Sequence, residues 1–208
     1  MSTSRWITFD CFGTLVDWQT GFRQILQPIV GDRLEEVMAA YHEAEPIVEK
    51  EHPSASYRTI LRESLARAAD VKSDVLAERW GELPVFADTE PSLSALRAAG
   101  WKLGILTNCD NDLFAATRAR FPVPIDEVVT AEEVGNYKPD LAHFTAFETR
   151  TGVDRADWVH AAVSYTHDMV PARALGLRRI WVDRERTGQD PSTVSARVTR
   201  LAELVRVL

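Results

Sequence analysis

The order of strand-like and helix-like segments is the feature that most constrains the fold. Trp6–Phe9 is a short β-prone run. The stretch from Trp18 to Leu83 has apolar residues at helical spacing, is broken at Pro53, and contains no convincing strand. After Pro84, short β-prone runs alternate with helix-like segments to the end of the chain. Such alternation implies right-handed crossovers and a parallel sheet covered by helices on both faces.

The expected elements define a core and an insertion. We expect further strands at Lys102–Leu106, Glu127–Thr130, Trp158–Val163 and Arg179–Val182. We expect core helices at Pro91–Ala99, Leu113–Arg120, Leu141–Arg150, Val170–Leu175 and Val194–Val207. The predicted fold is α/β, with a doubly wound, Rossmann-like parallel sheet and an inserted helical cap. Residues 1–16 and 84–208 would form the core, and residues 17–83 the cap.

Composition limits the classes of partner. The 208 residues are 45% hydrophobic and carry a net charge of −7, which is typical of a soluble protein and disfavours a nucleic-acid partner. The two cysteines, Cys11 and Cys109, form no disulfide framework or zinc pattern. The N-terminus lacks the apolar segment of a signal peptide, and no apolar run reaches the ~20 residues that cross a bilayer. We therefore expect a cytoplasmic protein with no membrane partner.

Polar residues follow the predicted strands. Ligands of doubly wound sheets bind beyond the carboxyl ends of the strands. Here those positions hold Asp10, the pair Thr107 and Asn108, the loop 133–138 and the segment 164–168. Taken singly, Asp10 could be a turn aspartate and Lys138 a surface lysine. Their common place at one sheet edge instead predicts a site.

Four segments resemble the motifs of one known superfamily. Segment 9–17, FDCFGTLVD, resembles the first motif of the haloacid dehalogenase superfamily, in which an aspartate nucleophile precedes a Gly-Thr-Leu turn. Thr107, Lys138 and Asp168 occupy the places of the second, third and fourth motifs. The resemblance implies that Asp10 is the nucleophile, that Lys138 keeps it ionised, and that Thr14 and Asp168 complete the catalytic group.

Two positions decide between branches of the superfamily. Its phosphatases carry a second aspartate where this chain has Phe12, which cannot transfer a proton. They place an acidic magnesium ligand where this chain has Val163. The resemblance is therefore to the type II (L-2-haloacid) dehalogenases, which implies metal-free hydrolysis of small 2-haloalkanoic acids through an ester, without a cofactor.

The chain also departs from the dehalogenase pattern. Phe144 replaces a tyrosine, and Val163 and Tyr165 replace a serine and an asparagine. Residues 39–45, in the expected cap, contain no arginine. Two alternatives thus stay open: a phosphatase or other hydrolase of this superfamily acting on a small anionic substrate, and a non-catalytic small-molecule binding protein.

The expected site can be stated in geometric terms. Candidate substrate-binding residues are Cys11, Phe12, Trp18, Tyr41, Thr107, Asn108 and His167. The expected substrate is a small anion, and the resemblance alone suggests a homodimer. The charged ends of Lys138 and Asp10 should approach to roughly 2.7–3.5 Å, with Asp168 holding Lys138. We expect this pairing to depress the pKa of Asp10.

Overall fold

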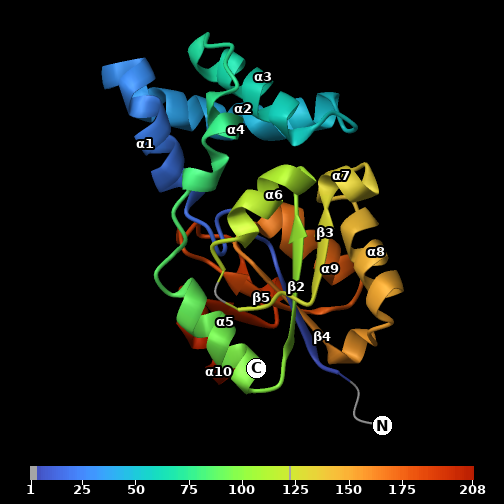
Figure 1. Cartoon of the computed structure of the whole chain (residues 1–208). Helices are drawn as coiled ribbons and strands as arrows, with labels where there is room; N and C mark the ends of the chain where they lie inside the picture. The colour runs from blue at the N-terminus through green and yellow to red at the C-terminus, as the bar shows by residue number, and fades with distance from the viewer. Residues whose placement is uncertain (1–3, 122) are drawn as a thin grey trace.

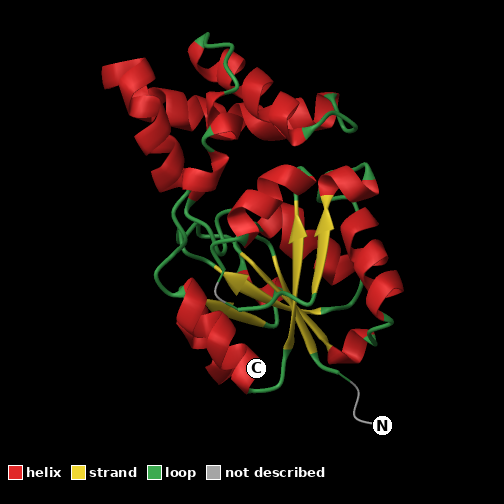
Figure 2. Ribbon diagram, viewed as in Figure 1, coloured by secondary structure: helices red, strands yellow, loops and turns green. Residues whose placement is uncertain are grey.

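A six-stranded parallel sheet forms the centre of the molecule in the computed structural model, which describes residues 4–121 and 123–208 (Figures 1 and 2). The strand order is β3-β2-β1-β4-β5-β6. The strands are β1 (Trp6–Phe9), β2 (Lys102–Thr107), β3 (Glu127–Thr130), β4 (Trp158–Ala162), β5 (Arg178–Val182) and β6 (Ala196–Val198). This order reverses direction beside β1, and it confirms the predicted doubly wound α/β fold.

Alternate side chains of each strand serve the two faces of the sheet. Ile7 and Phe9 pack in the cluster that contains apolar residues of α5 (Thr89–Ala98), α6 (Asn111–Arg118) and α10 (Leu204–Val207). Trp6 packs on the opposite face with α8 (Ala142–Thr151) and α9 (Val170–Ala174). Both faces are covered, and every residue of β1 and β4 is buried.

A second group of helices lies over the carboxyl edge of the sheet (Figure 1). It comprises α1 (Trp18–Val30), α2 (Leu34–Glu51), α3 (Tyr57–Ala69), α4 (Val75–Glu78) and the 3₁₀ turn Trp80–Glu82. We call residues 18–82 the helical layer. The Asp17 side chain caps α1 and that of Ser56 caps α3, and α2 ends just before Pro53 as predicted. No helix in the described part of the chain is long and apolar enough to cross a membrane.

The two segments that join the layer to the sheet run side by side. Val16 and Val85 form an antiparallel bridge. The Asp17 N–H donates to the Pro84 carbonyl at 2.8 Å, and the Phe86 N–H donates to the Leu15 carbonyl at 3.0 Å. The chain therefore leaves the core and returns to it at one place. The first three residues of the expected core range lie outside the described residues.

The last expected helix, Val194–Val207, is wrong. Residues 196–198 form β6, which pairs in parallel with β5, and the helix is limited to α10. Val194, Val198, Leu201 and Leu204 have helical spacing, which explains the prediction. The backbone instead pairs with β5, and the Asp183 N–H donates to the Val198 carbonyl at 2.8 Å. A free sheet edge thus overrides the helical pattern.

Candidate active site

A buried lysine joins two carboxylates at the carboxyl edge of the sheet. The Lys138 ammonium donates to Asp10 Oδ1 at 3.0 Å and to Asp168 Oδ1 at 2.6 Å. Its third donor reaches the Leu106 carbonyl oxygen at 2.9 Å. Lys138 is 1% exposed, and Asp10 follows β1 directly. The predicted geometry is confirmed. Because an ammonium has three N–H donors, Lys138 has none left for a ligand.

The expected depression of the Asp10 pKa is wrong. Burial raises the pKa of Asp10 above its ordinary value, and the attraction of Lys138 does not cancel this effect because Asp168 repels the same charge. The pKa of Asp168 is lowered to about 2, since Lys138 and His160 together outweigh its burial. The two carboxylates also raise the pKa of Lys138, against the effect of burial. Both carboxylates thus interact with the Lys138 charge, and this charge lowers the pKa of Asp168 more effectively than that of Asp10.

His160 is a site residue that sequence reasoning missed. Its Nε2 lies 3.0 Å from Asp168 Oδ1, and its Nδ1 lies 2.8 Å from the Thr8 hydroxyl. The Trp158 indole N–H donates to the same hydroxyl at 2.8 Å. An ionised Asp168 can only accept, so the Nε2 of His160 donates to it. This buried chain of side chains fixes the orientation of Asp168. In the sequence, His160 appears as one residue of an apolar strand.

Thr14 holds the other carboxylate oxygen of Asp10. Its hydroxyl donates to Asp10 Oδ2 at 3.1 Å and accepts from the Val163 N–H at 3.0 Å. Gly13 has a φ of +90°, and a Cβ there would lie 2.9 Å from a Val163 methyl group. The turn after Asp10 therefore needs glycine for its conformation and for this close approach.

Asn108 positions the lysine loop. Its Oδ1 accepts from the Lys138 N–H at 2.7 Å, and its amide donates to the Lys138 carbonyl at 3.1 Å. This pair of bonds fixes the backbone of Lys138 against the end of β2. Asn108 also borders the cavity, and its role in substrate binding stays a prediction.

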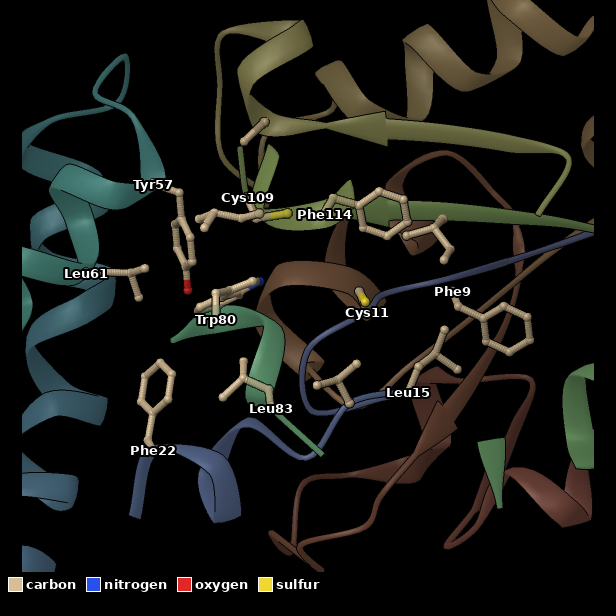
Figure 3. Packing of buried hydrophobic residues seen from close by; sticks show 14 of the residues in the cluster. Phe9, Cys11, Leu15, Phe22, Tyr57, Leu61, Trp80, Leu83, Cys109 and Phe114 are labelled. Carbon is tan, nitrogen blue, oxygen red and sulfur yellow. The ribbon is translucent and has the colours of Figure 1, made fainter. Parts of the chain in front are cut away.

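A cavity of about 400 Å³ lies between the sheet edge and the helical layer. The sheet side contributes Asp10, Phe12, Thr107, Asn108, Lys138 and residues 163–168. The layer contributes Trp18, Phe22, His42, Glu45, Pro46, Glu49, Tyr57 and Trp80. Figure 3 shows Phe22, Tyr57 and Trp80 reaching the same region from three separate helical segments. The glutamates and Tyr57 were not predicted, since which side of a helix faces a cavity depends on packing.

Most of the predicted residues border this cavity, but Thr14, Tyr41 and Cys11 do not. Tyr41 is buried beside Phe22, and its hydroxyl donates to Glu45 at 3.0 Å. Cys11 is buried among apolar side chains (Figure 3), where burial raises the pKa of its thiol well above the ordinary value. Both side chains turn into the core instead of the cavity. His167 borders the cavity with its Nε2 3.9 Å from Glu49, whereas Arg58 pairs with Asp112 on the surface.

The residues at the sheet edge do not fit the magnesium ion of the phosphatase branch. Phe12 and Val163 offer no side-chain oxygen, although hard cations require oxygen ligands. Lys138 already occupies the space between Asp10 and Asp168. Among the described residues, no group of three or more His, Cys, Asp or Glu side chains could hold a metal ion.

The strand order defines a Rossmann-like protein. Asp10 and the buried Lys138 place its candidate site where the strand order reverses. The family model described as haloacid dehalogenase-like hydrolase matches residues 5–161. The chain therefore belongs to the haloacid dehalogenase-like hydrolase family, and its core is that of a hydrolase.

The names of similar proteins indicate more than one activity. Haloacid dehalogenase-like hydrolase domain-containing protein 3 of Danio rerio is 31% identical over 109 residues, which cover 52% of this chain and 44% of that protein. Phosphatase MT3486 of Mycobacterium tuberculosis is 29% identical, covering 88% and 89%. (S)-2-haloacid dehalogenase 1 of Pseudomonas sp. is 29% identical, covering 69% and 64%. The chain matches less than two thirds of the Danio and Pseudomonas proteins.

Solved structures share the whole architecture. A dehalogenase in complex with an intermediate has a TM-score of 0.87 at 19% identity, covering 100% of this chain and 98% of the other. The L-2-haloacid dehalogenase of Xanthobacter autotrophicus with covalently bound chloropropionic acid has a TM-score of 0.83 at 18% identity, covering 99% and 98%. At these identities the similarity establishes the fold.

Proposed function

We propose that the protein hydrolyses a carbon–halogen bond of a small molecule, with Asp10 as covalent nucleophile and without a metal ion. The observation that carries the proposal is the Asp10 carboxylate, which borders the cavity while Lys138 and Thr14 hold its two oxygens. We further propose that residues 17–83 act as a cap and that the enzyme works in the cytoplasm.

The reaction proceeds in two displacements. An Asp10 oxygen attacks the halogenated carbon, and the carbon–halogen bond breaks as halide leaves with its electron pair. The product of this step is an ester of Asp10. Water then adds to the ester carbonyl and the acyl C–O bond breaks, which releases an alcohol and a proton and leaves one water oxygen in Asp10. A raised pKa makes Asp10 a better nucleophile than an ordinary aspartate once it is ionised.

The choice of leaving group rests on Phe12. Halide leaves as an anion and needs no proton, whereas an alkoxide leaving group needs an acid at the position that Phe12 occupies. The dehalogenase names among the relatives point in the same direction and suggest 2-haloalkanoic acids as substrates. The second candidate is a phosphatase, which the relative matched over 88% of this chain favours.

A substrate panel tests the proposal. The purified protein is assayed with 2-chloropropionate, other small chloroalkyl compounds and phosphate esters, with EDTA and with added Mg²⁺. We expect halide release that EDTA leaves unchanged. Phosphate release that requires Mg²⁺ would select the phosphatase, and no turnover of any compound would favour a binding protein.

Isotope labelling tests the intermediate. In H₂¹⁸O, a single turnover should place ¹⁸O in the peptide that contains Asp10, because water attacks the ester carbonyl. Asp10→Asn should lose turnover by roughly 10³-fold or more, since an amide is a poor nucleophile. Label in the product alcohol, with none in Asp10, would contradict covalent catalysis.

A further inference from the structure

Acidic groups outnumber basic ones around the cavity. The lining residues include five carboxyl side chains, namely those of Asp10, Glu45, Glu49, Asp168 and Glu185. Among the described lining residues, Lys138 is the one lysine and no arginine is present. The three N–H donors of Lys138 are all engaged by the protein. A carboxylate substrate would therefore meet negative charge without a free ammonium or guanidinium to balance it.

The two glutamates of α2 are held in different ways. Glu45 and Glu49 lie one helical turn apart, on the same side of α2. Glu45 Oε1 accepts from the Tyr57 hydroxyl at 2.6 Å and from the Tyr41 hydroxyl at 3.0 Å. Among the described residues, no side chain donates to the other oxygen, Oε2. Burial and the nearby Glu45 charge raise the pKa of Glu49 to about 9, so Glu49 is protonated at neutral pH. Glu49 is buried, whereas Glu45 is half-buried, so Glu45 is the more accessible carboxyl group that the layer presents to the cavity.

Four aromatic rings that pack on one another line the same cavity as Glu45. The ring centres of Trp18 and Phe22 are 5.2 Å apart, those of Phe22 and Trp80 are 6.0 Å apart, and those of Trp80 and Tyr57 are 5.6 Å apart. All four side chains border the cavity. The faces of aromatic rings attract cations, and the combination of rings with a carboxylate is suited to an ammonium group.

A proline interrupts the hydrogen bonding of α2 beside the cavity. Pro46 lies inside α2 and borders the cavity together with His42. Because proline has no N–H, the carbonyl of His42, four residues earlier, lacks its usual helical donor. This carbonyl and Glu45 belong to the same turn of α2.

We propose that the helical layer binds a positively charged ammonium group of the substrate through Glu45 and the rings of Trp18, Phe22, Tyr57 and Trp80. The substrate is then an organic cation whose reactive carbon reaches Asp10, in place of the small anion that the resemblance suggested. The identity of the reaction rests on the proposed function, whereas the cation site does not.

Binding to the intact protein tests the cation site without turnover. Choline and its uncharged isostere 3,3-dimethylbutanol are titrated calorimetrically at neutral pH, with propionate as the anion. We expect choline to bind at least tenfold more tightly than the isostere and propionate to bind more weakly still. Equal binding of choline and the isostere, or tighter binding of propionate, overturns the proposal.

A pair of variants locates the effect. Glu45→Gln removes the charge and keeps an oxygen that accepts from Tyr57, so it should weaken choline binding about tenfold with an unchanged unfolding midpoint. Glu43→Gln removes a charge from the exposed side of α2 and is the matched control, with choline affinity expected within twofold of the parent. Equal losses in the two variants would reduce the effect to general electrostatics and overturn the assignment to Glu45.

Turnover separates this proposal from the proposed function. Chloride release is compared between (2-chloroethyl)trimethylammonium and 2-chloropropionate, with choline as competitor. The expected result is faster release from the cation, inhibited by choline. Choline binding without chloride release from either compound would support the cation site and contradict the proposed function. Chloride release from 2-chloropropionate that choline does not inhibit would support the proposed function and overturn the cation site.

Discussion

At the scale of single residues, Asp10 and Asp168 bond the same ammonium, yet their pKa values move in opposite directions. Asp168 is fixed by a shorter bond to Lys138 and by His160. Asp10 has Lys138 and the Thr14 hydroxyl, and it suffers the repulsion of Asp168. The arrangement divides the work between the acids, since Asp168 holds the lysine and Asp10 keeps a reactive lone pair.

The raised Asp10 pKa predicts the pH dependence of activity. The ionised form attacks, so kcat/KM should fall as pH drops through the Asp10 pKa, at a pH above the ordinary aspartate value of about 3.9. The Thr14 hydrogen bond lowers this pKa. Thr14→Val should therefore move the acid limb to higher pH, and Thr14→Ser should restore it. A pH–rate profile with the limb unmoved in Thr14→Val would show that another group controls it.

At the scale of elements, one aspartate connects the sheet to the helical layer. Asp110, in the loop after β2, accepts from the backbone N–H groups of Tyr57 and Arg58 at 2.7 and 3.0 Å. These are unpaired donors at the start of α3. Asp110 is buried, and it places Tyr57 over the cavity.

Removing this connection should loosen the layer. Asp110→Ala should lower the free energy of unfolding by about 1–2 kcal/mol, as expected for a lost helix cap, and raise KM because Tyr57 is no longer fixed. Asp112→Ala is the control, since Asp112 pairs with Arg58 at the exposed surface and such pairs contribute about 0–1 kcal/mol. Urea unfolding and steady-state kinetics measure both effects. Equal losses in the two variants would contradict the assignment.

The elements also show what the sequence can and cannot predict. Asp10, Lys138 and Asp168 were predictable because a parallel sheet brings the ends of its strands to one edge, whatever the details of packing. Tyr41 and Glu45 lie on one helix, and only packing decides that Glu45 borders the cavity while Tyr41 turns inward. β6 was missed because it has only three residues and its own pattern favours a helix.

At the scale of the whole molecule, a continuous apolar cluster runs from the sheet into the helical layer and includes Phe9, Leu15, Phe22 and Trp80 (Figure 3). The polar site lies beside this cluster, so its charges contribute to the stability of the whole fold. Asp168, with a pKa of about 2, stabilises the folded state above the ordinary aspartate pKa, and this contribution is lost as pH falls toward 2.

Lys138→Met should reverse that dependence. Without the ammonium, burial and mutual repulsion raise the folded-state pKa values of Asp10 and Asp168 above their unfolded values. Stability is then greatest at acid pH and is lost as pH rises through the raised pKa values. At pH 8 the loss should be about 3–5 kcal/mol, as for a broken buried ion pair, and at pH 5 it should be smaller. Urea titrations at the two pH values measure this, and an equal loss at both would contradict the account.

The paired connectors at Val16 and Val85 have a consequence for inheritance. Because the chain departs and returns at one point, the helical layer is encoded by a single uninterrupted stretch of gene. Asp10 lies just before that stretch, and Lys138 and Asp168 lie well after it. Duplication or exchange of the stretch could therefore change which molecule is recognised while leaving the reacting groups untouched. On the proposed function, Glu45 and the reacting groups are therefore encoded in separate stretches and meet only in the folded protein.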